Sequence, residues 1–187
     1  HLQNSPLEDM LAGKENGVWR KYSTQEVSNI VNDLSAGLLK LGISCNDRSP
    51  ERRDKIAIVS KNRPEWLMVD LAVQQLGAVL TPIYPTISVN ELEFILQDAE
   101  VKIIFLNDEA LYEKVHSIKN RLPNLKEIFS FEKIPDVKHW TQLLNKDPDL
   151  LQQVRSISGT ITSAELATII YTSGTTGKPK GVMLSHK

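Results

Sequence analysis

Apolar residues recur every three or four positions after Ser23, and this spacing predicts an amphipathic helix. Ser23 and Glu26 have the spacing of a capping box, in which each side chain satisfies a backbone N–H group at the start of a helix. Gly42 suits the left-handed turn that commonly ends one. The predicted apolar stripe consists of Val27, Ile30, Val31, Leu34, Leu38 and Leu41. One face of this helix is therefore expected to pack into a core.

Short apolar runs that lack the helical spacing predict strands. They occupy residues 56–59, 78–80, 102–106, 127–131, 167–171 and 182–184. The first run is continuously apolar, which is typical of a strand in a sheet that is covered on both faces.

Helical patterns lie between these strands. Asn62 is expected to cap one helix, with Pro64 in its first turn. Ser88 and Glu91 repeat the capping box, and Asp108 is a candidate cap for a helix near 109–121. Residues 132–163 are less regular, with short helices expected around positions 140 and 150. The alternation predicts an α/β fold, in which a mainly parallel sheet with right-handed crossovers is flanked by helices.

Size and charge narrow the function classes. The chain has 187 residues, 41% of them hydrophobic and 24% charged, which suits one large globular domain or a domain with a subdomain. The formal net charge of −1 offers no electrostatic case for binding nucleic acid. The most basic stretch, residues 48–55, has acidic residues interleaved with its cations and is predicted to be a solvated loop.

The single cysteine, Cys45, excludes an internal disulfide and fits a reducing compartment such as the cytoplasm. No apolar run approaches the roughly 20 residues needed to span a bilayer. The first residues lack a signal-peptide hydrophobic core and have the composition expected for the middle of a longer chain.

A glycine-rich, hydroxyl-rich segment at residues 171–181 carries the candidate chemistry. It follows the apolar run 167–170 directly and contains four serine and threonine hydroxyls, three glycines and two lysines, namely Thr172, Ser173, Gly174, Thr175, Thr176, Gly177, Lys178, Lys180 and Gly181. Glycines allow tight turns whose N–H groups point at phosphate oxygens, and the hydroxyls and lysines add donors and positive charge. The segment is therefore interpreted as a phosphate-binding loop; the alternative is a glycine–threonine hairpin without ligand.

The loop is not a Walker A loop, whose pattern is G-x-x-x-x-G-K-[ST]. The residue five before Gly177 is Thr172 rather than glycine, and Lys178 is followed by Pro179 rather than by serine or threonine. Residues 171–181 instead resemble the signature of the adenylate-forming enzymes, written [YF]-T-S-G-[ST]-T-G-x-P-K-G, at every specified position. This superfamily includes acyl-CoA synthetases, luciferases and peptide-synthetase adenylation domains.

The resemblance extends from about residue 20 to the end of the chain. Segments 62–66, 70–72, 76–79 and 82–86 look like the long-chain fatty-acid branch of the acyl-CoA synthetases. The aromatic residues of these segments, Trp66 and Tyr84, are interpreted as packing residues. One departure concerns Arg53 and Asp54, which stand where relatives usually have a Gly-Asp pair.

The resemblance implies that a fatty acid is activated by ATP as an acyl-adenylate, with release of pyrophosphate, and that the acyl group then passes to CoA. The nine residues listed above are the implied contacts to the ATP phosphates, with Lys180 favoured over Lys178 because the signature specifies it. Mg²⁺ is implied as well, and Thr172 is the candidate ligand, since this ion keeps mostly water and phosphate ligands. No catalytic residue is assigned within these 187 positions.

The resemblance also predicts that residues 1–187 form the first part of a large N-terminal AMP-binding domain, ending just after the loop 171–181. The C-terminal domain and its catalytic lysine would lie beyond it, so the chain alone is expected to be inactive. Expected partners are small molecules (fatty acid, ATP and CoA), and peripheral membrane contact and oligomeric state stay open. The alternatives are another adenylate-forming enzyme, such as an aryl-CoA ligase or an adenylation domain, and a stand-alone nucleotide-binding domain without catalysis.

Overall fold

A parallel sheet forms the centre of the computed structural model, which describes residues 5–15, 17–43, 47–172 and 177–187. Its strands follow the order β7-β6-β5-β3-β4-β8-β9, and every pair of neighbours is parallel except β8 and β9. The strands are β3 (Lys55–Val59), β4 (Val79–Ile83), β5 (Val101–Leu106), β6 (Glu127–Ser130), β7 (Lys138–His139), β8 (Leu166–Thr172) and β9 (Lys180–Ser185). The prediction of an α/β fold with a mainly parallel sheet is confirmed.

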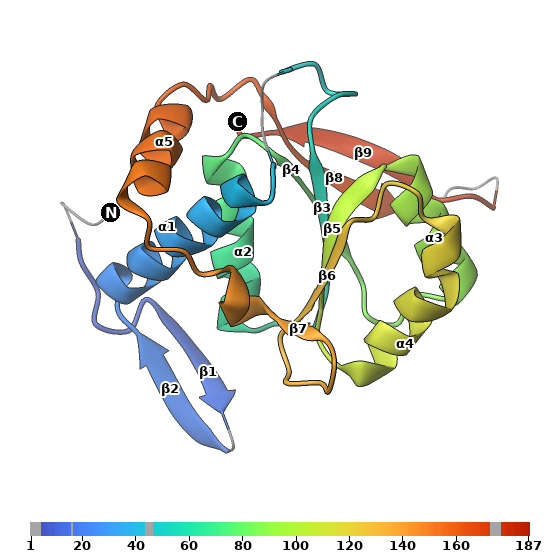
Figure 1. Cartoon of the computed structure of the whole chain (residues 1–187), viewed down its shortest axis with the longest axis horizontal. Coiled ribbons are helices and arrows are strands. Elements are labelled where there is room, and N and C mark those ends of the chain that lie inside the picture. The colour runs from blue at the N-terminus through green and yellow to red at the C-terminus, as the bar shows by residue number, and fades with distance from the viewer. Residues whose placement is uncertain (1–4, 16, 44–46, 173–176) are drawn as a thin grey trace.

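Helices cover both faces of this sheet (Figure 1). On one face lie α1 (Thr24–Lys40), α2 (Pro64–Gln75) and α5 (Pro148–Ser158), and on the other lie α3 (Val89–Asp98) and α4 (Glu109–Ile118). Short 3₁₀ helices span Lys119–Arg121 (η1) and Trp140–Leu143 (η2). Strand order reverses at β3, which has β4 on one side and β5 on the other, so α2 and α4 leave the sheet on opposite faces. This double cover explains why β3 is buried along its whole length.

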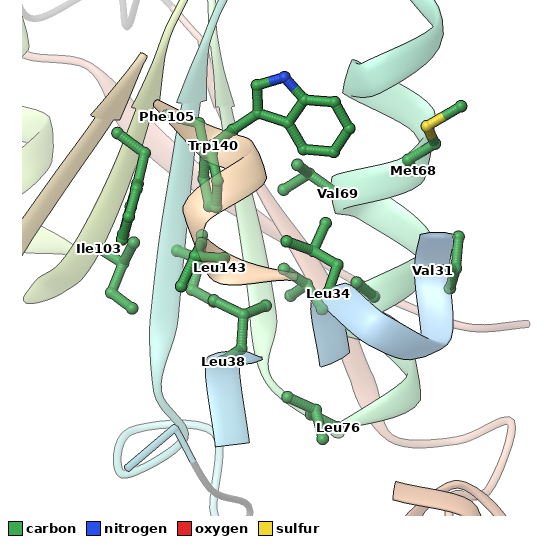
Figure 2. Packing of buried hydrophobic residues seen from close by; sticks show 14 of the residues in the cluster. Val31, Leu34, Leu38, Met68, Val69, Leu76, Ile103, Phe105, Trp140 and Leu143 are labelled. Carbon is green, nitrogen blue, oxygen red and sulfur yellow. The ribbon is translucent and has the colours of Figure 1, made fainter. Parts of the chain in front are cut away.

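The larger core cluster lies between the sheet and the helices α1 and α2. Leu34 and Leu38 of α1 pack with Val69 of α2 and with Leu76, the residue after that helix, and η2 adds Trp140 (Figure 2). Phe105, Phe129 and Phe131 line the sheet side, with ring centroids 5.5 and 5.8 Å from Phe105. Burial of these side chains is the main force that holds the layer together.

α1 approaches η2 so closely that only a glycine fits at position 37. A Cβ atom built on Gly37 would lie 1.7 Å from the carbonyl oxygen of Leu143. Glycine in a helix interior costs about 1 kcal/mol relative to alanine, so close packing of the two backbones accounts for its presence in α1.

Most of the predicted helix ends are confirmed. Both capping boxes are present, at Ser23 and Ser88, and Asp108 accepts a hydrogen bond of 3.1 Å from the Leu111 N–H. Gly42, which follows the C-cap residue Leu41 of α1, has a φ of 83°.

The prediction that Asn62 caps α2 is wrong. Arg63 occupies the N-cap position, without a side-chain cap, and Pro64 follows in the first turn. The Arg63 guanidinium pairs with Glu65 at 2.9 and 3.0 Å and lies over the Phe131 ring. The side chain is therefore engaged with a carboxylate and an aromatic ring, and it does not cap the helix.

A hairpin that the apolar pattern did not predict precedes α1. Its strands, β1 (Leu11–Glu15) and β2 (Val18–Tyr22), form a separate antiparallel sheet that projects from the α1 side (Figure 1). Val18 and Trp19 are 70% and 63% exposed, so the hairpin lacks the buried face that period-two patterns depend on.

Among the described residues, we find no helix that combines the length and apolar character needed to cross a bilayer.

Candidate phosphate-binding site

The signature segment connects the last two strands of the sheet. β8 runs parallel to β4, and the Thr168 hydroxyl donates to the Leu80 carbonyl oxygen at 2.8 Å. β9 returns antiparallel to β8 at the edge of the sheet (Figure 1). The connection between them therefore begins at the carboxyl end of a parallel strand, the edge at which open α/β sheets bind their ligands.

Two of the predicted phosphate contacts face each other across this hairpin. Thr172, the last residue of β8, pairs with Lys180, the first residue of β9, and both are exposed. Directly opposed residues of antiparallel strands project to the same face, with Cβ atoms about 5 Å apart. The pair therefore presents a hydroxyl and an ammonium group side by side at the carboxyl end of β8.

The other predicted phosphate contacts do not share one position or one environment. Ser173, Gly174, Thr175 and Thr176 lie outside the described residues. Gly177 has a φ of 86°, a left-handed conformation that favours glycine. The Lys178 ammonium lies 5.7 Å from the centroid of the Phe94 ring on α3, so it points toward that helix. Phosphate or metal binding by any of the nine residues stays a prediction.

Gly181 does not form the tight turn expected of it. It lies inside β9 opposite Tyr171. A Cβ atom there would come within 2.8 Å of the Ile169 side chain and 3.2 Å of the Tyr171 ring. Gly181 thus makes room for a tyrosine ring that lies across the strand pair, which gives this glycine a packing role.

Tyr171 joins the hairpin to α3. Its hydroxyl donates a hydrogen bond of 2.5 Å to Asp98, the last residue of that helix. Burial raises the pKa of the Tyr171 phenol well above its ordinary value, and the hydrogen bond and negative charge of Asp98 add to the shift. The hydroxyl is therefore protonated, and remains a donor, over the whole physiological pH range.

A cavity of about 240 Å³ opens beside the hairpin, between the ends of β4 and β8. Tyr84 and Ile83 contribute to one wall, and Thr172 and Pro179 to another. Tyr84 is 81% exposed, so its interpretation as a packing residue is wrong. It follows the last residue of β4 at the same carboxyl edge, where the other described residues leave it largely uncovered.

An ion-pair network anchors the start of β8. Glu165, one residue before the strand, pairs with Arg53 and accepts a hydrogen bond of 2.9 Å from Arg48. The Arg53 side chain is 1% exposed, so the prediction that residues 48–55 form a solvated loop is wrong at this position. The hydrogen bond from Arg53 is the main cause that lowers the pKa of Glu165 from 4.5 to about 2. Sequence reasoning missed this pair because its members are 112 residues apart.

His186 lies away from the hairpin's loop end. It is exposed, and its backbone N–H donates to the Glu165 carbonyl oxygen at 3.2 Å. It also contributes to the wall of a cavity of about 490 Å³ among α1, α2 and the segment after α5. Among the described residues, no three His, Cys, Asp or Glu side chains are grouped as a metal site.

One face of the β8–β9 hairpin is largely exposed. Ile169 is buried, at 8% exposure, whereas Ile170 is 37% exposed. Side chains alternate along a strand, so Ile170 projects to the face opposite Tyr171 together with its cross-strand neighbour Val182, which is 44% exposed. This part of the sheet face has little cover from the described helices.

Comparison with solved proteins confirms the fold. The crystal structure of the anthranilate CoA ligase AuaEII, in complex with anthranoyl-AMP, superposes with a TM-score of 0.69. It is 22% identical, and the match covers 89% of this chain and 29% of that one. The chain thus has the fold of the corresponding part of that structure.

The chain belongs to the AMP-binding enzyme family, which matches residues 4–187. Its relatives include the long-chain-fatty-acid–CoA ligase FadD15 of Mycobacterium bovis, 30% identical over 182 residues. Another is the long-chain-fatty-acid–CoA ligase ACSBG2 of Xenopus laevis, 31% identical over 182 residues. These matches cover 91% and 94% of this chain but only 27% and 24% of the relatives, so the chain spans about a quarter of their length.

Proposed function

We propose that the chain is the phosphate-binding part of an ATP-dependent long-chain fatty-acid–CoA ligase. The observation that carries the proposal is the Thr172–Lys180 pair, which closes a loop of adenylate-former sequence at the carboxyl end of β8. The names of the relatives support the fatty-acid substrate. The division into a partial N-terminal domain at residues 1–187 and a C-terminal domain beyond it is part of the same proposal.

The proposed reaction has two steps. A carboxylate oxygen of the fatty acid attacks the α-phosphorus of ATP, and the bond to the bridging oxygen breaks, so that pyrophosphate leaves. The thiolate of CoA then attacks the acyl carbonyl carbon and displaces AMP. Negative charge develops on the leaving pyrophosphate in the first step only.

Lys180 and Thr172 would act on that leaving group. An ammonium group and a hydroxyl held on one face of the hairpin can orient the β- and γ-phosphates and stabilise the developing charge. Lys178 points toward α3 and is the weaker candidate of the two lysines.

Mg²⁺ and CoA complete the proposal. The exposed Thr172 hydroxyl, at the edge where the phosphates would lie, fits a ligand for Mg²⁺, which would neutralise phosphate charge. CoA is the acyl acceptor, for which we assign no contact. A cytoplasmic location stays a prediction; fractionation of cells would test it and would also show any attachment to membranes.

ATP–pyrophosphate exchange tests the proposal directly. A protein of the relatives' length that contains this chain should catalyse exchange with long-chain fatty acids. Exchange with aryl or amino acids alone would favour the alternative adenylate-forming enzymes. Binding of ATP without exchange would favour a stand-alone nucleotide-binding domain.

Lys180→Ala separates the two steps. We expect about a 100-fold slower adenylation, because removing one donor that stabilises developing charge typically costs 10²–10³ in rate. Thiolation measured with preformed acyl-adenylate should be nearly unchanged, since pyrophosphate has already left. Lys178→Ala serves as the matched control and should have the smaller effect. An equal loss in both steps would show that Lys180 has a structural role.

A further inference from the structure

Helix α3 contacts the candidate phosphate loop at two places, one before and one after residues 173–176, which lie outside the described part of the chain. Asp98 accepts the hydrogen bond from Tyr171, which precedes them, and Phe94 lies under Lys178, which follows them. Phe94 and Asp98 are four residues apart and therefore lie on one face of the helix. One face of α3 thus contacts both ends of the loop.

The Tyr171 side chain is fixed from several directions. Its ring lies across Gly181, the residue opposite it on β9, and its hydroxyl reaches Asp98 at 2.5 Å. It also separates two cavities, one of about 320 Å³ that includes Asp98 in its lining and the other of about 240 Å³ beside Thr172. Movement of this ring would therefore change the space on both sides of it.

Fixing Tyr171 also fixes the residues predicted to bind phosphate. Successive side chains of a strand point to opposite faces, so a Tyr171 held toward α3 directs Thr172 to the other face. Lys180 is the cross-strand partner of Thr172 and projects to that same face. The orientation of Thr172 and Lys180 is thus linked to helix α3 through Tyr171.

We infer that Tyr171 and Asp98 are positioning residues that hold Thr172 and Lys180 in place for adenylation. This inference rests on the proposed function. The two residues act through the hairpin. We assign neither of them a contact with the reacting atoms. The contact between Phe94 and Lys178 helps in the same way, because it holds the other end of the loop against α3.

Three variants test the hydrogen bond between Tyr171 and Asp98: two remove it, and a third keeps an acceptor for it. In the full-length protein, Tyr171→Phe and Asp98→Ala should each slow adenylation by about tenfold or more, because small misplacements remote from the reacting atoms can cost up to about 100-fold. Asp98→Asn retains an oxygen that can accept from Tyr171 and should recover most of the rate. Thiolation from preformed acyl-adenylate should stay within about twofold in all three.

Tyr112→Phe is the matched control. The Tyr112 hydroxyl lies 3.3 Å from Nδ1 of His116 on α4, so this variant also removes a hydrogen-bonded phenol, at a place remote from the loop. It should leave both steps unchanged. Equal losses of adenylation and thiolation in Tyr171→Phe, or adenylation at the wild-type rate, would overturn the inference.

Hydrogen exchange of the 187-residue chain provides a readout that does not need activity. Tyr171→Phe should speed amide exchange in residues 177–182 by about tenfold, the factor that corresponds to roughly 1.4 kcal/mol of lost local stability. Exchange in β3 and β5 should not change. Wild-type protein that adenylates no acid would refute the proposed function, and the exchange result would still decide whether Tyr171 and Asp98 position the loop. Unchanged exchange in residues 177–182 would overturn the positioning role.

Discussion

Glu165→Gln tests how much the buried ion pair before β8 contributes to stability. Arg53 is almost fully buried, and its nitrogens donate to the Arg48 carbonyl oxygen at 3.1 Å, to the Gly77 carbonyl oxygen at 3.0 Å and to Glu165. Neutralising the carboxylate leaves the guanidinium charge buried. Removing one partner of a buried pair costs about 3–5 kcal/mol. Glu165 itself is 12% exposed, so some water reaches the pair, and we expect a loss near the lower limit, about 3 kcal/mol.

Urea unfolding at pH 7 measures this loss, and Glu127→Gln is the matched control. Glu127 pairs with Lys138 at 2.7 Å, but their side chains are 26% and 53% exposed, respectively, and an exposed pair is worth about 0–1 kcal/mol. The structure therefore predicts a clear difference between two chemically identical substitutions. A loss in Glu165→Gln no larger than that in Glu127→Gln would refute the reasoning.

The effect of pH gives a second test of the same pair. The folded-state pKa of Glu165 is lowered from 4.5 to about 2, so the carboxylate stabilises the folded chain fully above about pH 5. This contribution is lost progressively as the pH falls from 5 toward 2, because the unfolded state then takes up the proton first. The stability difference between wild type and Glu165→Gln should therefore shrink between pH 5 and pH 3. A stability difference that stays constant between pH 5 and pH 3 would contradict the lowered pKa of Glu165.

Two further predictions concern other parts of the chain. Gly37→Ala should destabilise the chain by about 2 kcal/mol or more, although alanine is the better helix former, because the added Cβ would clash with the Leu143 carbonyl oxygen. Urea unfolding measures this loss, and a gain in stability would show that η2 moves aside freely. The 187-residue chain alone should show no ATP–pyrophosphate exchange with any fatty acid, because positioning must be complete for adenylation; clear turnover would refute the proposal that further residues are needed.

Local signals in the sequence predicted most of the fold. The capping boxes at Ser23 and Ser88, the Asp108 cap and the apolar runs all act within a few residues, so a pattern along the chain is enough to find them. The β1–β2 hairpin was missed because its side chains are largely exposed. Asn62 was misassigned because the choice between adjacent cap positions depends on where Arg63 finds its partners.

Features of the site that depend on distant residues could not be predicted. The burial of Arg53 needs Glu165, and the role of Tyr171 needs Asp98, 73 residues earlier. The signature identified Gly181, but only the pairing of β8 with β9 shows that the Tyr171 ring occupies the space of a missing side chain. The family motif therefore indicated the candidate site, and the tertiary structure supplied the packing reasons for individual residues such as Gly181 and Tyr171.

The pairing of β4 with β8 also sets an order of events during synthesis. Leu80 lies opposite Thr168, so the edge of β4 stays without its neighbour until 88 more residues have been made. At translation rates of about 5–20 residues per second, this interval is roughly 4–18 s. The strands β3 to β6 are complete well before then and can assemble first, whereas β8 and β9, which flank the candidate phosphate-binding loop, are the last of the described strands to be added. We expect pulse-labelled chains to become protease-resistant at the edge of β4 only after β8 has been synthesised, so that among the described strands the hairpin is the last to join the sheet.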